Sequence, residues 1–216
     1  MDNLSLGQRI IVWLLPVVFA ITVHEVAHGM AAKKLGDNTA QALGRLTLNP
    51  LKHIDPIGTL LIPGLLLLTG TGFIFGWAKP VPVDGRNFKK PLHDMAWVAI
   101  AGPASNLLMA IAWALIARIG IIANTEFVTA PLMHMGMAGI SINLVLCLLN
   151  LLPIPPLDGS RVLTGLLPLN LAIQYNQLER YGFIILLVLL YTGIINSILE
   201  YPLYIIQQWF FSLAGI

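Results

Sequence analysis

Long apolar runs dominate the pattern of hydrophobic and polar positions along the chain. The four longest runs cover residues 10–32, 95–116, 138–152 and 183–199. A helix needs about 20 consecutive apolar residues to cross a bilayer, so the pattern predicts a bundle of membrane-spanning helices. The composition agrees, because 57% of the residues are hydrophobic and 10% are charged, against roughly 25% charged in an average soluble domain. We therefore expect an all-α polytopic membrane protein with about four to six membrane segments.

The chain is expected to form one membrane-embedded domain over residues 1–216. Its net charge of +2 excludes the strongly basic surface that nucleic-acid binding requires. Cys147 is the single cysteine, which rules out a disulfide within the chain and a cysteine-based zinc site. We expect a metal-motif helix at residues 10–33, strands with a re-entrant segment at 39–92, and a helix at 94–118. A helix that leads into an Asp-Gly motif follows at 134–160, and C-terminal helices follow at 181–216.

A polar cluster interrupts the first apolar run near its end. His24, Glu25 and His28 form the pattern H-E-x-x-H, and positions i and i+4 of a helix project from one face, one turn apart. The two imidazoles can therefore hold one metal ion, while Glu25 can accept a proton from a water that the ion activates. The alternative is three polar residues in a bundle core, but each ionisable group costs about 2.5–3.5 kcal/mol to insert into a membrane. The motif favours the site of a zinc hydrolase.

A third protein ligand is needed, because catalytic zinc takes three and keeps one position for water or substrate. Several carboxylates and the other histidines are candidates. Asp158 stands out, because it lies in the stretch NLLPIPPLDGSR, residues 150–161, directly after an apolar run. The three prolines of this stretch prevent a regular helix, and membranes tolerate such backbone only where it is buried in protein or lines a watery cavity. The stretch indicates a functional site, with a simple helix-ending turn as the alternative.

The basic residues decide whether Asp158 can reach the histidines. Lys33 and Lys34 follow the motif, so the positive-inside rule places that end of the helix in the cytoplasm. If residues 57–76 crossed the membrane, Asp158 would arrive on the opposite face. If they enter and return, Asp158 comes back to the depth of the histidines, and only Arg9 and Arg118 of the 12 Lys and Arg lie outside. We therefore expect a re-entrant segment and an active site toward the cytoplasmic side.

In combination, HEVAH at residues 24–28 and NLLPIPPLDG at residues 150–159 resemble the site-2 protease family of intramembrane zinc metalloproteases. Further stretches, NPLKHIDPIGT, GWAKPVPVD and AGPASN, are similar to its short bacterial and archaeal members without a PDZ domain. The resemblance implies that His24, His28 and Asp158 bind one Zn²⁺ and that Glu25 is the general base. It also implies that Asn150 helps to hold substrate or the developing oxyanion, although a hydrogen bond to a neighbouring helix is an equal alternative.

The implied substrates are transmembrane proteins, cut within or next to their membrane segments. Residues 39–48 and 77–84 alternate well enough to form short strands that pair with an unwound substrate, with ordinary loops as the alternative. His53, near the cytoplasmic mouth, is a candidate for orienting substrate or protonating the leaving group; a solvated loop histidine is the alternative. Asn106 either braces a metal ligand or makes a purely structural interhelical hydrogen bond.

Two other classes of function stay open at this stage. A membrane metal-ion transporter also places His and Asp in membrane helices, but it has no need of a base beside the first ligand. A non-catalytic metal-binding membrane scaffold is the other alternative. For the protease, we expect a multi-pass protein of the prokaryotic inner membrane whose partners are the lipid bilayer and membrane-protein substrates. The sequence identifies neither the substrate nor the oligomeric state.

Overall fold

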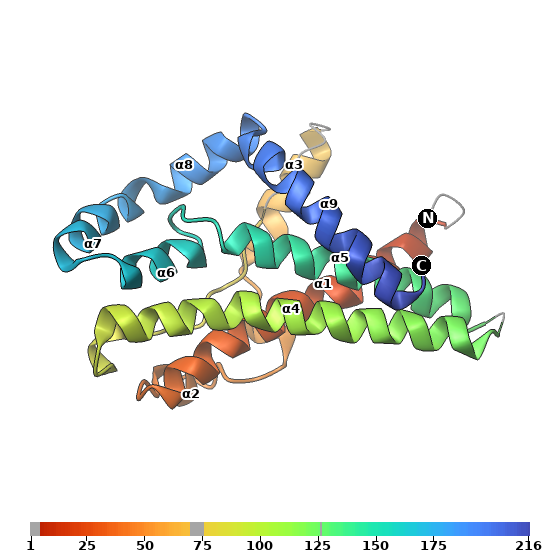
Figure 1. Cartoon of the computed structure of the whole chain (residues 1–216), viewed down its shortest axis with the longest axis horizontal. Coiled ribbons are helices and arrows are strands. Elements are labelled where there is room, and N and C mark those ends of the chain that lie inside the picture. Colours follow the sequence, from red (N-terminus) through yellow and green to blue (C-terminus); the bar gives the residue numbers. More distant parts are fainter. Residues whose placement is uncertain (1–4, 70–75, 126) are drawn as a thin grey trace.

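The computed structural model describes residues 5–69, 76–125 and 127–216, and over these residues the chain is a bundle of α-helices (Figure 1). Within them, three helices are long and apolar enough to cross a membrane: α1 (Leu6–Lys34), α4 (Pro91–Ala123) and α5 (Thr129–Asn150). A bent pair, α8 (Glu179–Tyr191) and α9 (Ile194–Ala214), adds a fourth candidate span. The shorter helices are α2 (Thr39–Ala42), α3 (Ile62–Thr69), α6 (Asp158–Leu166) and α7 (Leu169–Asn176). The expectation of an all-helical fold is confirmed, and the described residues contain three or four candidate spans, at or below the lower end of the expected four to six.

The centre of the bundle is formed by α1, α4 and α5, with α9 lying across α4 and α5 (Figure 1). Small residues allow the helices to approach closely: a Cβ added to Gly139 of α5 would lie 2.2 Å from the Trp113 ring of α4. The buried cluster between α4, α5 and α9 contains Ala110, Ala114, Ala117, Ile140, Leu144, Phe210 and Ala214. Because α4 runs opposite to α1 and α5, the C-terminal ends of α1 and α5 lie at the same end of the bundle (Figure 1).

The fourth apolar run, residues 183–199, is broken rather than continuous. The chain bends by 71° between α8 and α9, and Gly193 adopts the left-handed conformation there, with a φ of 76°. Glycine enters this conformation without the steric cost that a Cβ brings. The bend turns α9 back onto the bundle, so residues 201–214 pack against α4 and α5.

Residues 57–76 were expected to enter the membrane and return to the same side. The residues at the two ends of this segment contact each other. A π-helical turn, Pro56–Leu61, leads into α3. The Trp77 N–H donates to the Gly58 carbonyl at 3.0 Å, and the Lys79 N–H donates to the His53 carbonyl at 2.9 Å. A Cβ on Gly58 would lie 2.3 Å from the Trp77 ring, so this contact requires glycine. Residues 70–75 of the segment lie outside the described residues.

The prediction of short β-strands near the site is wrong for the described residues, which contain no strand. In the first segment, residues 39–48, Asp37 accepts the Thr39 N–H at 3.0 Å and the chain turns into α2 instead. The second segment, residues 77–84, is extended, but Pro80 and Pro82 lack the N–H groups that a ladder needs. Side chains of the protein bond several of its other backbone groups, among them the Val81 N–H and the Lys79 carbonyl, and no strand of the described residues pairs with it.

Asp37 is the main anchor of this extended segment. Its carboxylate is fully buried, and it accepts the Asp84 N–H at 2.8 Å and the Asn87 side-chain N–H at 2.8 Å. Burial raises the pKa of Asp37, but the hydrogen bonds from Thr39, Asp84 and Asn87 outweigh burial and lower it. The segment after residue 76 is therefore fixed to the loop that follows α1.

Candidate metal centre

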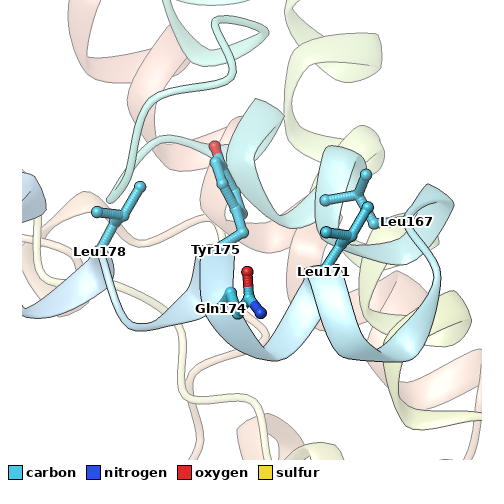
Figure 2. A pocket seen from close by; sticks show the side chains of 5 residues that line it. All are labelled: Leu167, Leu171, Gln174, Tyr175 and Leu178. Carbon is cyan, nitrogen blue, oxygen red and sulfur yellow. The ribbon is translucent and has the colours of Figure 1, made fainter.

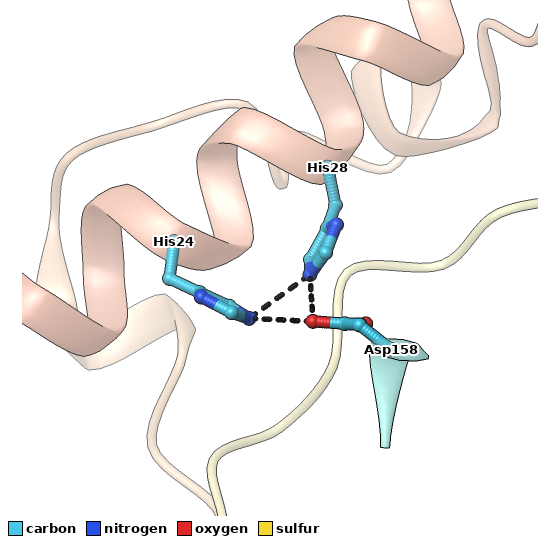
Figure 3. A group of neighbouring side chains, drawn as sticks. All are labelled: His24, His28 and Asp158. Atoms are coloured by element: carbon cyan, nitrogen blue, oxygen red, sulfur yellow. Dashed lines mark hydrogen bonds and ion pairs between the residues drawn. The ribbon is translucent and has the colours of Figure 1, made fainter. Parts of the chain in front are cut away.

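Three side chains from α1 and α6 meet at one point (Figure 3). His24 Nε2 lies 3.0 Å from His28 Nε2. Asp158 Oδ2 lies 3.2 Å from the first of these nitrogens and 3.3 Å from the second. The histidines come from consecutive turns of α1, as the H-E-x-x-H spacing predicts, and Asp158 is the first residue of α6. The two elements are joined by more than 120 residues of chain, so the bundle itself creates the cluster.

A glycine in α4 makes room for the two imidazole rings. A Cβ added to Gly102 would lie 2.5 Å from His28 Nε2 and 2.6 Å from His24 Cε1. These separations are far below van der Waals contact, so any other residue at this position would push the rings away. Pro103 follows directly, at a place where its ring loosens the preceding helical turn.

The other ring nitrogen of each histidine is engaged by α4. His24 Nδ1 lies 2.5 Å from Asn106 Oδ1, and His28 Nδ1 lies 2.7 Å from the Val98 carbonyl oxygen. A backbone carbonyl can only accept, so His28 carries its hydrogen on Nδ1 when neutral. Its Nε2 then presents a lone pair to the centre of the cluster. This is the usual arrangement of metal-binding histidines, whose second nitrogen donates to a carbonyl or carboxylate.

The donor set fits a zinc ion. Zinc-ligand bonds of about 2.0–2.2 Å in a tetrahedral site place neighbouring ligand atoms roughly 3.3 Å apart, close to the observed 3.0, 3.2 and 3.3 Å. Asp158 Oδ2 is a buried carboxylate oxygen without a hydrogen-bond partner among the described residues. Two lone-pair nitrogens and an anionic oxygen that face one another at these distances repel unless a cation lies between them. The geometry therefore supports the predicted ligand set, whose role in catalysis stays a prediction.

The loop before Asp158 is held from three sides. A Cβ on Gly159 would lie 2.3 Å from the Leu151 carbonyl oxygen, so the loop closes tightly against the start of α6. From α7, the Tyr175 hydroxyl donates to the Pro153 carbonyl at 2.8 Å. From α8, Gly182 packs against Pro155, where an added Cβ would lie 2.7 Å from its backbone. These contacts hold the proline-rich stretch in place, and with it the position of Asp158.

Glu25 lies beside the ligands and contacts the extended segment. Its Oε2 accepts the Val81 N–H at 2.7 Å, and the side chain is half-buried. A carboxylate has two oxygens, so Glu25 can keep this contact and still accept a proton through Oε1. Arg45 fixes the same segment by donating to the Lys79 carbonyl at 2.9 Å. The segment that was expected to be a strand therefore orients the predicted base.

Two further predicted residues make their hydrogen bonds elsewhere. Asn150 ends α5 and donates to the Leu146 carbonyl of its own helix at 3.0 Å. His53 is 2% exposed, which excludes the alternative of a solvated loop histidine; its Nε2 lies 2.9 Å from the Thr47 carbonyl oxygen. The role of either residue in substrate binding stays a prediction. Among the other histidines, the exposed His93 and the half-buried His134 lie outside the three-residue cluster.

A surface groove of about 390 Å³ lies along α7 and contains none of the predicted site residues (Figure 2). Its lining residues are Leu167, Leu171, Gln174, Tyr175 and Leu178. The groove is open and mostly apolar, and its connection to the metal cluster is the Tyr175 hydroxyl, which reaches the loop before Asp158. Burial raises the pKa of Tyr175, so the phenol remains a hydrogen-bond donor at neutral pH.

Comparison with known proteins agrees with this geometry. The chain is 44% identical over 189 residues to "Putative zinc metalloprotease YwhC" of Bacillus subtilis, an alignment that covers 86% of this chain and 83% of the relative. It is 30% identical over 209 residues to "Putative zinc metalloprotease Rip2" of Mycolicibacterium smegmatis, covering 94% of this chain and 73% of the relative. The Rip2 protein of Mycobacterium tuberculosis is 27% identical over 201 residues, covering 91% and 71%. Neither a family model nor a solved structure matches the chain.

Proposed function

The chain belongs to the site-2 protease family of zinc metalloproteases, and from this premise we propose that it is an intramembrane endopeptidase. It hydrolyses peptide bonds within or next to the transmembrane segments of other membrane proteins. The observation that carries the proposal is the convergence of His24, His28 and Asp158 on one point, beside a glutamate. A metal site of three protein ligands with an adjacent carboxylate is suited to hydrolysis.

His24, His28 and Asp158 hold one zinc ion in this proposal. When bound, zinc polarises the scissile carbonyl and lowers the pKa of water toward about 7. Glu25 accepts a proton from the attacking water and delivers it to the nitrogen of the leaving amine. The Val81 N–H, at 2.7 Å from Glu25 Oε2, keeps the carboxylate in place during both transfers. Asn150 and His53 are proposed to contact the substrate strand, as the family resemblance implies.

The proposed membrane placement puts the site near the cytoplasmic face. Residues 57–76 enter and return, which is supported by the two hydrogen bonds that join His53 and Gly58 to Lys79 and Trp77. The loops on either side of this segment then carry their lysines and arginines on one side of the membrane, in accord with the positive-inside rule. Water can reach the metal from that side. The bacterial relatives support a location in a prokaryotic cell membrane.

Cleavage of a model single-span substrate by the purified protein in liposomes tests the proposal. The wild type should cut the substrate, and Glu25→Gln should be at least about 10²-fold slower, because general-base catalysis contributes roughly 10²–10⁴-fold. Both should contain about one zinc ion per chain, and His24→Ala should lose it. Glu179→Gln, which alters an exposed carboxylate at the start of α8, is the matched control and should cleave like wild type.

Equal cleavage by wild type and Glu25→Gln, with zinc in both, would refute the proposed mechanism. Wild type without zinc would refute the metal site, and wild type that binds zinc but neither cleaves the substrate nor transports the ion would favour the metal-binding scaffold. Zinc transfer into the liposomes without substrate cleavage would favour a transporter.

A further inference from the structure

A chain of buried amides connects α5 to the first histidine. Asn106 of α4 and Asn143 of α5 are both fully buried, at 0% exposure. Asn106 Nδ2 donates to Asn143 Oδ1 at 2.9 Å, and Asn106 Oδ1 lies 2.5 Å from His24 Nδ1. The chain therefore runs from α5 through α4 to α1 and ends on a predicted zinc ligand.

Backbone carbonyls fix the direction of every hydrogen bond in this chain. Asn143 Nδ2 donates to the Gly139 carbonyl at 2.8 Å, so Asn143 presents Oδ1 to Asn106. Asn106 Nδ2 donates to Asn143 and also to the Ala20 carbonyl at 3.2 Å. Both hydrogens of the Asn106 amide are then used, and the atom that faces His24 is the acceptor Oδ1. His24 must therefore donate from Nδ1.

The consequence is a single tautomer of His24. A neutral imidazole with its hydrogen on Nδ1 has its lone pair on Nε2, the atom that lies 3.2 Å from Asp158 Oδ2. His28 needs no side-chain partner to fix its tautomer, because its Nδ1 is hydrogen-bonded to the Val98 backbone carbonyl. The orientation of His24, unlike that of His28, thus depends on side chains.

We propose that Asn106 and Asn143 are positioning residues of the zinc site: Asn106 orients the His24 ring and fixes its tautomer, and Asn143 orients Asn106. The inference rests on the proposed function only in taking zinc as the metal. A purely structural role would be served by any pair of interhelical hydrogen bonds, which stabilise the bundle without acting on the metal. The two roles differ in what they do to zinc affinity.

The experiment measures the zinc dissociation constant in detergent by competition with a chelating dye, together with thermal unfolding of the metal-free protein. Asn106→Leu should weaken zinc binding by roughly 10- to 100-fold, the usual effect of removing the partner of a ligand. Asn143→Leu should weaken it by a smaller factor, because Asn106 keeps its bond to Ala20. Asn106→Asp should recover only part of the affinity lost in Asn106→Leu, since a carboxylate accepts the His24 Nδ1 hydrogen but cannot donate to Asn143 Oδ1 and the Ala20 carbonyl.

The matched control is Ser141→Ala, which removes another interhelical contact of α5, the 2.6 Å hydrogen bond from Gln207. It should lower the unfolding temperature and leave zinc affinity unchanged. Zinc affinity equal to wild type in folded Asn106→Leu would overturn the inference. If Asn106→Leu does not fold, Asn143→Leu and Asn106→Asp decide the question, with wild-type affinity in the former as the contrary result.

Peptide cleavage is measured in parallel to separate this inference from the proposed function. A wild type that binds zinc but does not cleave, with affinity lost in Asn106→Leu, refutes the protease and supports the positioning role. A wild type that cleaves, with unchanged zinc affinity in Asn106→Leu, refutes the positioning role alone.

Discussion

Each histidine of the metal centre uses its two ring nitrogens for different purposes. Nε2 faces the centre, at 3.0 Å from its counterpart, while Nδ1 is held by α4 through Asn106 or the Val98 carbonyl. One helix thus orients both ligands that another helix supplies. Gly102 belongs to the same helix and lies directly under the rings. The residue types of α4 therefore matter to the metal although none of them is a ligand.

Substitution of Gly102 by alanine tests this dependence. The added methyl would lie 2.5 Å from His28 and 2.6 Å from His24, so both rings must move. Overpacking of this kind costs about 1–3 kcal/mol, which corresponds to roughly 5- to 150-fold weaker zinc binding if the strain falls on the ligands. Zinc titration of the purified variant measures the effect.

Gly64→Ala is the control for Gly102→Ala. Gly64 also lies in a helix, and an added Cβ there has no atom within 4 Å. Both substitutions improve helix propensity, so a difference between them reports the clash. Normal zinc affinity in Gly102→Ala would show that the imidazoles are free to shift, and the packing argument would fail.

Local spacing made part of the site predictable. His24, Glu25 and His28 lie within five positions of one helix, and helical periodicity alone places the two rings on one face. Asp158 was identifiable because prolines and an Asp-Gly pair interrupt an apolar context. The sequence left Asn106 open between a brace for a metal ligand and a structural hydrogen bond, and it did not indicate the contact of Gly102, because each acts on a helix far away in sequence, as the His24–Asn106 pair shows with a separation of 82. The stretch AGPASN, residues 101–106, indicated close helix packing but not which side chains lie against it.

At the scale of elements, α6, α7 and α8 form a clamp on the loop that carries Asp158. The loop itself cannot form a regular helix because of its prolines. Tyr175 of α7 and Gly182 of α8 reach it from different directions. A further hydrogen bond, from Thr164 to Asn176 at 2.9 Å, fastens α6 to the end of α7. The position of the carboxylate thus depends on α7 and α8, which contain no predicted site residue.

Tyr175→Phe should remove the hydroxyl's hydrogen bond to the loop and leave the packing of the aromatic ring at position 175 unchanged. Loss of one hydrogen bond costs about 1 kcal/mol, so zinc affinity should fall by roughly fivefold and the unfolding temperature by about 2–4 °C. Tyr191→Phe, at a residue that is 87% exposed, should change neither quantity. If Tyr175→Phe binds zinc as tightly as wild type, the loop is held by the remaining contacts and the hydroxyl is dispensable.

The two predicted strands show why elements of this region were harder to predict than the helices. Alternation of polar and apolar residues over 77–84 gave an extended segment, as expected, but strand formation also needs a partner with free backbone groups. Here Glu25, Asp37 and Arg45 take the groups that a neighbouring strand would have used. Residues 39–48 are not extended, because the hydrogen bond between Asp37 and the Thr39 N–H turns the chain into α2. Side-chain partners decided both outcomes, from distant positions for residues 77–84 and from two residues upstream for residues 39–48.

At the scale of the whole molecule, the meeting of Asp158 with the histidines constrains the topology. The sequence left two possibilities for residues 57–76, and only the one that enters and returns brings α6 to the C-terminal end of α1. The contacts from Trp77 to Gly58 and from Lys79 to His53 agree with the return. The positive-inside rule and the meeting of Asp158 with the histidines favour the same course of this segment, which stays a prediction.

Cysteine labelling in intact cells and inside-out vesicles tests this topology directly. The native thiol is replaced in a Cys147→Ala background, and single cysteines are placed at Arg86, Lys52 and Phe127. Arg86 has a side chain that is 89% exposed, and its surface ion pair with Asp84 contributes little to stability, so the substitution should leave the fold intact.

A membrane-impermeant maleimide should label Arg86→Cys and Lys52→Cys only in inside-out vesicles. Phe127→Cys, in the exposed connection between α4 and α5, should be labelled only in intact cells. Labelling of Arg86→Cys in intact cells, with Phe127→Cys labelled only in inside-out vesicles, would place residues 57–76 across the membrane, where the chain could not return Asp158 to the histidines.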